Sequence, residues 1–176
     1  MISVRRVFSR VILRLLPISR FCRINAFFFR FQGYNIHTSA RIYSTAQIIG
    51  DIEVSIGRNT FIGHESLIMG GESKIIIGDD CDISSRVSII SGTHKIDMVE
   101  KRSAGAGTGF DIFIEDGVWI GFGAIVGPGV KIGRKSIIGA GSVVVNDIPS
   151  YCIAVGNPCK PIKKWNSEKL VFEIIK

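Results

Sequence analysis

The chain has 176 residues, of which 46% are hydrophobic and 21% are charged, so its composition is that of one folded domain and excludes a disordered or fibrous protein. No run of uncharged apolar residues approaches the ~18 that a membrane-spanning helix needs. The four cysteines share no metal-binding or redox spacing and are too few for a disulfide scaffold, and no signal peptide with a cleavage site is evident. We therefore expect a protein of the reducing cytoplasm.

The net charge of +7 belongs to the N-terminal segment. Residues 1–35 contain seven arginines and no other charged side chain. The rest of the chain carries equal numbers of basic and acidic residues, so it lacks the basic stripe that is typical of nucleic-acid-binding proteins. We expect no nucleic-acid partner.

Residues 1–35 are predicted to form a basic helical arm. An apolar stripe recurs there at helical spacing, at Val4, Val7, Phe8, Val11, Ile12 and Leu15. Pro17 is expected to end this helix, and an aromatic run around Phe28 indicates a second, short one. Two compatible interpretations stay open: the stripe caps the end of the domain core, or the arm contacts the anionic inner face of the cell membrane.

A six-residue repeat begins at Ile36. Each unit opens with Ile or Val, and the residue four positions later is usually small. The openers are Ile36, Ile42, Ile48, Ile56, Ile62, Ile68, Ile77, Ile83, Ile89, Ile114, Ile120, Val126, Ile132, Ile138 and Val144. A period of six fits neither an amphipathic helix nor a simple strand, but it is typical of a parallel β-helix whose openers point inward. We predict five triangular coils, over residues 36–53, 56–73, 77–94, 114–131 and 132–149.

The repeat is interrupted between the third and fourth coils. The segment 95–113 contains the glycine-rich run Ser103–Gly109, which is too flexible for a coil face and is predicted to protrude as a loop. His94 stands immediately before this loop.

Several motifs occur in an order that resembles a known family. They are Ile77-Gly78-Asp79-Asp80, Ser91-Gly92-Thr93-His94, Gly117-Val118-Trp119-Ile120-Gly121, Ile138-Gly139-Ala140-Gly141-Ser142 and Gly156-Asn157-Pro158-Cys159-Lys160-Pro161-Ile162. This order resembles the hexapeptide-repeat acetyltransferases, closest to the galactoside, maltose and exopolysaccharide O-acetyltransferases. The resemblance implies an all-β fold, a left-handed parallel β-helix of about five coils, and a homotrimer with active sites between chains.

The predicted organisation has three parts. Residues 1–35 form the arm, 36–149 the β-helix acyltransferase domain with the loop 95–113, and 150–176 a tail that binds coenzyme A. The resemblance also implies that acetyl-CoA is the co-substrate and that the acetyl group passes directly to the acceptor in a ternary complex.

The resemblance makes His94 the general base that removes the proton of the acceptor. An imidazole, with an ordinary pKa of about 6.5, suits this task at neutral pH. A lone histidine at the start of a loop would otherwise be read as a surface residue. Backbone N–H groups at Phe122 and Gly123 are candidate donors to the oxyanion.

Two further residues are assigned to the acceptor. Glu72 breaks the small-residue rule at an inward corner below His94, and it matches an acid that binds the sugar in the family. Its carboxylate could accept hydrogen bonds from sugar hydroxyls or orient the imidazole; the alternative is a bulged surface acid. His64 lies half a perimeter from His94, so only a neighbouring chain could bring the two together; the alternative is a polar interface residue. The three histidines, at 37, 64 and 94, include no close pair, and we expect no metal site.

The resemblance implies that the cofactor lies along the groove between two chains, beside the fourth and fifth coils. Trp119 would pack on the pantetheine, and Gly121, Gly123, Ala140 and Gly141 lack bulk, so the cofactor could approach the backbone. Ala140 and Asn146 match contact positions of the family. Lys160, Lys163 and Lys164 would neutralise phosphate, unless they form an ordinary solvated tail.

The predicted function is transfer of an acetyl group from acetyl-CoA to a sugar hydroxyl in bacterial surface polysaccharide biosynthesis. The basic arm favours a lipid-linked sugar, and hence a cytoplasmic protein that is peripheral on the cell membrane. The alternatives are N-acetylation of a nucleotide-linked amino sugar, O-acetylation of an antibiotic, and a non-enzymatic β-helix scaffold.

Overall fold

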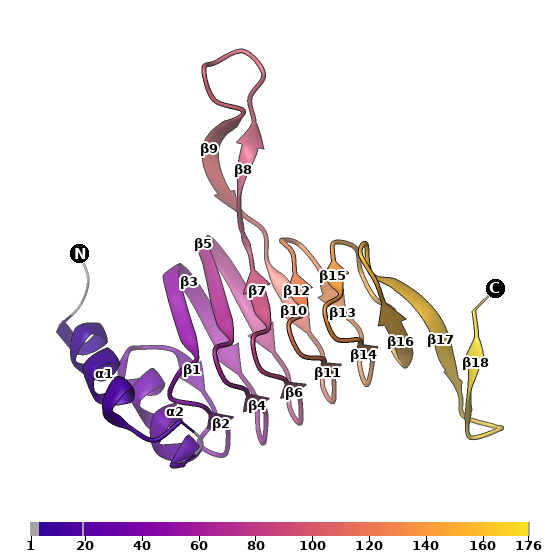
Figure 1. Cartoon of the computed structure of the whole chain (residues 1–176), viewed down its shortest axis with the longest axis horizontal. Coiled ribbons are helices and arrows are strands. Elements are labelled where there is room, and N and C mark those ends of the chain that lie inside the picture. Colours follow the sequence, from indigo (N-terminus) through magenta and orange to yellow (C-terminus); the bar gives the residue numbers. More distant parts are fainter. Residues whose placement is uncertain (1–3, 19, 176) are drawn as a thin grey trace.

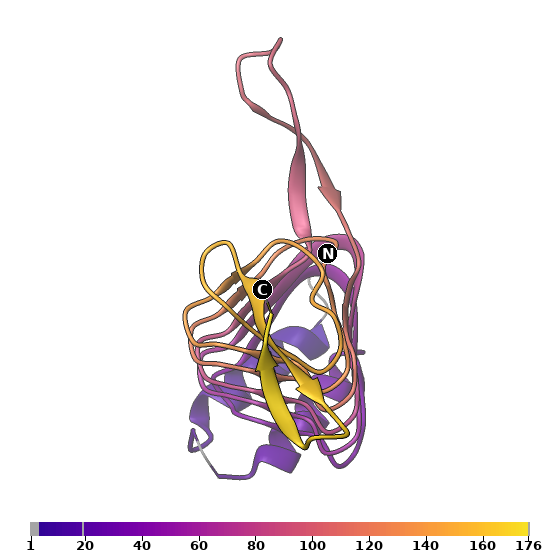
Figure 2. The ribbon, with the colours of Figure 1, turned by 90° about the vertical axis from the view of Figure 1, so that its right-hand side faces the viewer.

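A computed structural model describes residues 4–18 and 20–175; positions 1–3 and 19 of the predicted arm and position 176 of the predicted tail lie outside the described residues. Two helices, α1 (Val4–Leu15) and α2 (Cys22–Phe31), stand at one end of a parallel β-helix (Figure 1). Seen along the axis, the coils follow one outline and a hairpin leaves from one corner (Figure 2). The predicted left-handed β-helix of about five coils is confirmed.

Each coil has three faces, and strands of one face pair in parallel with those of the next coil. The first face holds β1 (Asn35–Ile36), the ends of β3 (Gln47–Ile56) and β5 (Leu67–Ile77), β10 (Ile112–Ile114) and β13 (Lys131–Ile132). The second holds β2 (Arg41–Ile42), β4 (Phe61–Ile62), β6 (Asp82–Ile83), β11 (Trp119–Ile120), β14 (Ile137–Ile138) and β16 (Cys152–Val155). The third holds the starts of β3 and β5, then β7 (Ser88–Ile90), β12 (Ile125–Val126) and β15 (Val143–Val144).

The core is the stack of repeat openers. All 15 predicted openers are buried and belong to one apolar cluster. Burying a side chain of this size contributes about 1.5–3 kcal/mol, so the stacked Ile and Val residues are the main stabilising element of the coil. Of the 15 residues four positions after the openers, 13 are buried, and the two exceptions are Glu72 and Thr93.

Both exceptions lie at the corner between the third and first faces. There β3 and β5 continue through the corner as long strands, and their pairing shifts between Asp51 and Ile52. The extra residue in β5 is Glu72, whose φ of 44° is left-handed, and Ser73 pairs with Ile52 in its place. The prediction that Glu72 occupies the inward corner is therefore wrong: Glu72 is exposed in a β-bulge, and Ser73 is buried.

The chain leaves the third coil after β7 and forms an antiparallel hairpin of β8 (Gly92–Ile96) and β9 (Ala104–Gly109). The segment protrudes, as expected (Figure 1). The expectation that the run Ser103–Gly109 is a flexible loop is wrong, because most of it is β9. Backbone pairing with β8 orders this run and requires no side chains.

The helices cover the open end of the first coil with a mixture of apolar and polar residues. Ser9 and Leu13 of α1 and Asn25, Ala26 and Phe29 of α2 are buried. The Nδ2–H group of Asn25 donates to the Ile42 carbonyl oxygen at 2.9 Å. Of the two interpretations left open for the stripe from Val4 to Leu15, packing on the coil is not what the structure shows, because most of the stripe is exposed and only Ile12 is half-buried.

At the other end, β16 is followed by β17 (Lys160–Asn166) and β18 (Val171–Ile174), which extend the second face as antiparallel strands. Across the described ranges 4–18 and 20–175, no helix is long and apolar enough to cross a membrane.

Candidate active site

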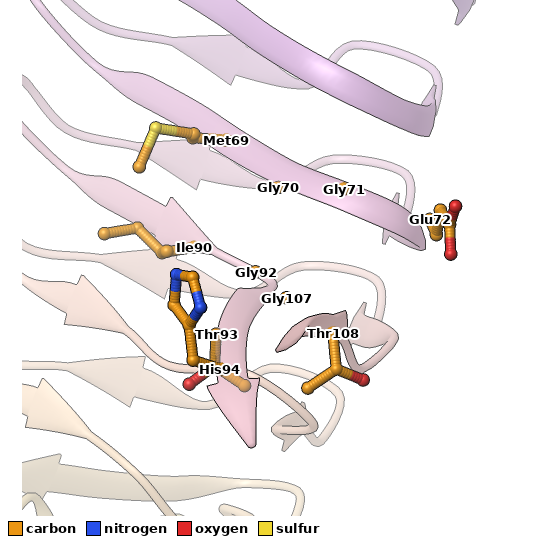
Figure 3. A pocket seen from close by; sticks show the side chains of 10 residues that line it. All are labelled: Met69, Gly70, Gly71, Glu72, Ile90, Gly92, Thr93, His94, Gly107 and Thr108. Atoms are coloured by element: carbon orange, nitrogen blue, oxygen red, sulfur yellow. The ribbon is translucent and has the colours of Figure 1, made fainter. Parts of the chain in front are cut away.

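A cavity of about 480 Å³ lies at the base of the hairpin, where β5 approaches β8 and β9. Its lining consists of Met69, Gly70, Gly71, Glu72, Ile90, Gly92, Thr93, His94, Gly107 and Thr108 (Figure 3). Two of the residues predicted for the site, His94 and Glu72, therefore line the same cavity. The two breaks in the inward pattern, Glu72 and Thr93, also lie here, so the site forms where the regular coil is interrupted.

The side of the cavity next to the coil is built from backbone. A Cβ atom on Gly70 would overlap the Ser91 hydroxyl, and one on Gly92 would lie 3.2 Å from the Gly70 Cα. Below these glycines the hydroxyls of Ser73 and Ser91, both buried, lie 2.7 Å apart and form a hydrogen bond. The close approach of neighbouring coils requires glycine, and the absence of side chains leaves room for a substrate.

The imidazole of His94 is held by the opposite strand of the hairpin. Its Nδ1 atom lies 2.9 Å from the carbonyl oxygen of Gly105. A carbonyl oxygen only accepts hydrogen bonds, so Nδ1 carries the proton and, in the neutral ring, Nε2 keeps its lone pair. Figure 3 shows the ring beside Ile90 and Gly92 in the cavity. This arrangement presents a proton acceptor to any hydroxyl that enters.

Gly105 is a site residue that the sequence did not indicate. Its carbonyl reaches Nδ1 because the β8–β9 pairing is irregular between His94 and Ile96. Gly105 belongs to the glycine-rich run downstream of His94, but that run predicts a loop and not a partner for the imidazole.

Within residues 4–18 and 20–175, no carboxylate forms a hydrogen bond with the His94 ring. Figure 3 shows the Glu72 carboxylate at the far side of the labelled group from the imidazole. Asp97 accepts hydrogen bonds at the hairpin turn from the N–H groups of Val99 and Glu100, at 2.9 and 3.0 Å. The Glu100 and Val99 N–H groups lower the pKa of the Asp97 carboxyl. Orientation of the imidazole therefore comes from the main chain of Gly105.

His64 lies at the corner between the second and third faces and does not line the His94 cavity, as expected for one chain. Its Nδ1 atom is 2.8 Å from the Thr45 hydroxyl, and its Nε2 atom is 3.3 Å from Glu65 Oε1. The Glu65 carboxylate only accepts hydrogen bonds, so Nε2 carries the proton of the neutral ring. The Thr45 hydroxyl, which also accepts the N–H of Glu65, then donates its O–H to Nδ1. A hydrogen bond from Arg86 lowers the pKa of the Glu65 carboxyl.

The small residues predicted to admit the cofactor meet at that same corner, in the last two coils. The Gly141 N–H group donates to the Phe122 carbonyl at 2.8 Å, and a Cβ on Gly121 would lie 2.6 Å from the Ala140 nitrogen. The Gly123 N–H group donates to the Ser85 carbonyl at 3.0 Å, so the expectation that it serves an oxyanion is wrong. This corner nevertheless carries no bulky side chain at four positions, Gly121, Gly123, Ala140 and Gly141.

An outward row of side chains runs from Trp119 toward the lysines. Trp119 pairs with Ile137, Ile137 with Ile153, and Ile153 with Lys163. Three strand steps of about 4.8 Å place the two ends of the row roughly 14 Å apart. Lys160 and Lys164 are exposed on the same strand as Lys163. An aromatic surface joined to cations in this way fits a long pantetheine thioester that ends in phosphates.

Asn146 belongs to another corner. It follows β15, in the column of corners from which the hairpin leaves, and is exposed. Within one chain, the predicted cofactor residues therefore lie in two groups, at two different corners of the β-helix. Among the described residues no group of three or more His, Cys, Asp or Glu could hold a metal ion.

Comparison with known proteins places this geometry in a family. The family model "bacterial transferase hexapeptide (six repeats)" matches residues 111–146, and "hexapeptide repeat of succinyl-transferase" matches residues 53–90. A maltose O-acetyltransferase structure from Clostridium difficile 630 is 32% identical, with 93% of this chain and 87% of that chain covered and a TM-score of 0.67. The chain belongs to the hexapeptide-repeat transferase family.

Other relatives carry related names. The galactoside O-acetyltransferase of Escherichia coli (strain K12) is 38% identical over 113 residues, 64% of this chain and 55% of the relative. The polysialic acid O-acetyltransferase of Escherichia coli O1:K1 / APEC is 39% identical over 132 residues, 70% of this chain and 42% of the relative. A galactoside acetyltransferase solved in complex with coenzyme A is 25% identical, with 94% and 82% of the chains covered and a TM-score of 0.71. The chain spans about half the length of the curated relatives that it matches.

Proposed function

We propose that this protein transfers the acetyl group of acetyl-CoA to a hydroxyl of a sugar, with His94 as the general base. The observation that carries the proposal is the hydrogen bond from His94 Nδ1–H to the Gly105 carbonyl, which leaves Nε2 as a proton acceptor in the cavity. The relatives named for galactosides, maltose and polysialic acid support a sugar hydroxyl as the acceptor.

In this proposal acetyl-CoA supplies the thioester, an activated acyl donor. His94 Nε2 takes the proton of the acceptor hydroxyl while the hydroxyl oxygen bonds to the acyl carbon. When the C–S bond of the thioester breaks, Nε2 returns that proton to the leaving sulfur. The Gly105 carbonyl faces Nδ1–H throughout and stabilises the protonated ring. A positioned base of this kind typically contributes about 10²–10⁴ in rate. The Glu72 carboxylate would accept hydrogen bonds from other hydroxyls of the sugar.

We infer that the working form is a homotrimer with sites between neighbouring chains. The inference is supported by the separation of the candidate residues in one chain. His94, Glu72 and Asn146 lie at one corner column, whereas His64, Gly121, Gly123, Ala140 and Gly141 lie at another. A cofactor that contacts both groups needs two chains placed side by side, with Trp119 and the lysines Lys160, Lys163 and Lys164 along the groove between them.

We place the reaction in bacterial surface polysaccharide biosynthesis in the cytoplasm. The similarity to a polysialic acid O-acetyltransferase supports this setting.

The test is an assay of acetyl-CoA with a panel of acceptors: a galactoside, maltose, oligosialic acid, a nucleotide-linked amino sugar and a streptogramin. Release of coenzyme A and the mass of the product are measured for the wild type and for His94→Ala. We expect an O-acetylated sugar that disappears with His94→Ala. Acetylation of an amino group or of the antibiotic alone would overturn the proposal, and so would a complete lack of transfer to the panel.

A further inference from the structure

We propose that the outer face of the helical arm docks on an anionic membrane surface. The outer face is defined here as seven of the exposed apolar residues of α1 and α2, namely Val4, Phe8, Val11, Leu15, Ile24, Phe27 and Phe31. The proposal concerns where the protein resides and does not depend on the acetyl transfer proposed above.

Each helix of the arm carries two stripes on opposite sides. In α1 the outer residues Val4, Phe8, Val11 and Leu15 follow spacings of four, three and four, which is one side of an α-helix. The buried residues Ser9 and Leu13 are five positions from Val4 and Phe8, and at about 100° per residue this spacing turns them roughly 140° away. The stripe that packs on the coil is therefore not the most apolar stripe of the helix.

The second helix repeats this arrangement. Asn25, Ala26 and Phe29 face the coil, while Ile24, Phe27 and Phe31 face away from it. The seven outer-face side chains of the two helices are 41–84% exposed. Exposed apolar stripes on two helices that contact each other are more than the scattered exposed residues of an ordinary protein surface, and indicate an interaction site.

Arginines surround this apolar surface. Arg5 of α1 lies with its guanidinium carbon 5.6 Å from the ring centre of Phe31 in α2, and Arg30 lies 5.9 Å from that of Phe27. Arg14, Arg20 and Arg23 are exposed around the same helices. Within the part of the chain that the structure describes, none of the seven arginines from Arg5 to Arg30 forms an ion pair.

The charge distribution favours a lipid surface over a second copy of this chain. The sequence has no Asp or Glu before Asp51, so two outer faces that met would bring their arginines together without counter-charges. An anionic leaflet offers phosphates to the arginines and hydrocarbon to the apolar side chains. Both helices are too short to span, so the contact lies in the interface plane.

The test is co-flotation of the full chain with vesicles of phosphatidylcholine alone and with vesicles that contain one third phosphatidylglycerol. We expect binding to the anionic vesicles at low salt, and weaker binding at high salt and to neutral vesicles. The triple variant Arg14→Gln, Arg20→Gln, Arg23→Gln should bind at least tenfold more weakly, because each basic residue near such a surface contributes about fivefold. The apolar variant Val11→Ser, Leu15→Ser, Phe27→Ser should lose binding while retaining its melting temperature.

Two matched controls distinguish vesicle binding through this face from nonspecific adsorption of other exposed apolar residues and from an effect of net charge. Leu170→Ser, Val171→Ser, Ile174→Ser removes three exposed apolar residues at the opposite end of the β-helix and should bind as the wild type does. Lys95→Gln, Lys101→Gln, Arg102→Gln removes three charges from the hairpin and should also bind normally. No binding of the wild type to anionic vesicles at low salt would overturn the proposal. So would equal losses in the arm variants and their controls, or an apolar variant that changes only the oligomeric state.

Discussion

The hydroxyl groups of Ser73 and Ser91 form a buried hydrogen bond of 2.7 Å between neighbouring coils, directly beneath the cavity that holds His94. They occupy inward positions because Glu72 and Thr93 have left the repeat. The pair closes the coil at the point where the hairpin leaves it.

Removing either hydroxyl breaks this hydrogen bond, although the Ser91 hydroxyl keeps a second partner, the Met69 carbonyl oxygen at 3.5 Å. We expect Ser91→Ala to lower the free energy of unfolding by about 1–2 kcal/mol, because the Ser73 hydroxyl is then buried without a partner and bears its full desolvation cost. Ser73→Ala should cost no more than this, because Ser91 still has the Met69 carbonyl. The double variant should lose less than the sum of the two. Denaturant unfolding of the four proteins in the cycle measures the difference, and strictly additive losses would contradict the pairing.

Gly70 and Gly71 form a matched pair for the close approach of the coils. A Cβ on Gly70 would overlap the Ser91 hydroxyl, while a Cβ on Gly71 would meet nothing within 4 Å. We expect Gly70→Ala to destabilise the protein by about 1–3 kcal/mol and Gly71→Ala to change stability by less than about 0.5 kcal/mol. Equal melting temperatures for the two variants would show that the coils are not packed as described.

The thiols inside the coil predict a dependence on alkaline pH. Burial raises the pKa of Cys81, Cys152 and Cys159 above the ordinary value of a thiol, about 8.5. A thiol with a raised folded pKa contributes stability below its unfolded pKa, and that contribution is lost as the pH rises through the folded pKa. In a Cys22→Ser background we expect slow reaction with a disulfide reagent at pH 8 until the protein unfolds. Rapid reaction of all three thiols in the folded protein would contradict their burial.

The raised pKa of the Cys81 thiol also predicts how the melting temperature changes with pH. Between pH 8 and 10 the melting temperature of the Cys22→Ser protein should fall, and Cys81→Ala in that background should fall less steeply. Parallel curves for the two proteins would remove Cys81 from the explanation.

The sequence predicted the regular part of the fold well, because inward Ile and Val residues at a period of six are typical of stacked three-sided coils. The left hand of these coils was implied by the family resemblance and not by the period. It failed at Glu72, since a six-residue count cannot place an inserted residue within a strand, and the bulge moved the inward position to Ser73. It also left open whether the apolar stripe of α1 packs on the coil. Hydrophobic periodicity locates the most apolar stripe, but here Ser9 and Leu13 pack and that stripe stays exposed.

For the site, the sequence identified His94 and Glu72 but not the contact that orients the imidazole. Gly105 supplies a main-chain carbonyl. Its position opposite His94 depends on an irregular strand pairing that no residue type predicts. The assignment of Gly123 as an oxyanion donor failed for a related reason, because its N–H group is already paired with Ser85 of the previous coil.

Mixed oligomers test the proposed sharing of sites between chains. If each site combines His94 of one chain with His64 of the next, an equal mixture of His94→Ala and His64→Ala chains should contain about one quarter intact sites. Activity should recover to roughly that fraction of the wild type, provided that each single variant is impaired. His94→Ala mixed with Glu72→Ala should show no recovery, because both residues line one cavity of the same chain. Recovery in the second mixture, or none in the first, would contradict the arrangement.

The most direct test of the account is the turnover number of His94→Ala with acetyl-CoA and the best sugar acceptor, measured beside the affinity for coenzyme A and beside His37→Ala as a control on an exposed histidine. We predict that kcat falls by at least about 10² in His94→Ala, while coenzyme A binding changes by less than a few-fold and His37→Ala behaves as the wild type. Near-wild-type turnover by a folded His94→Ala protein would contradict the account.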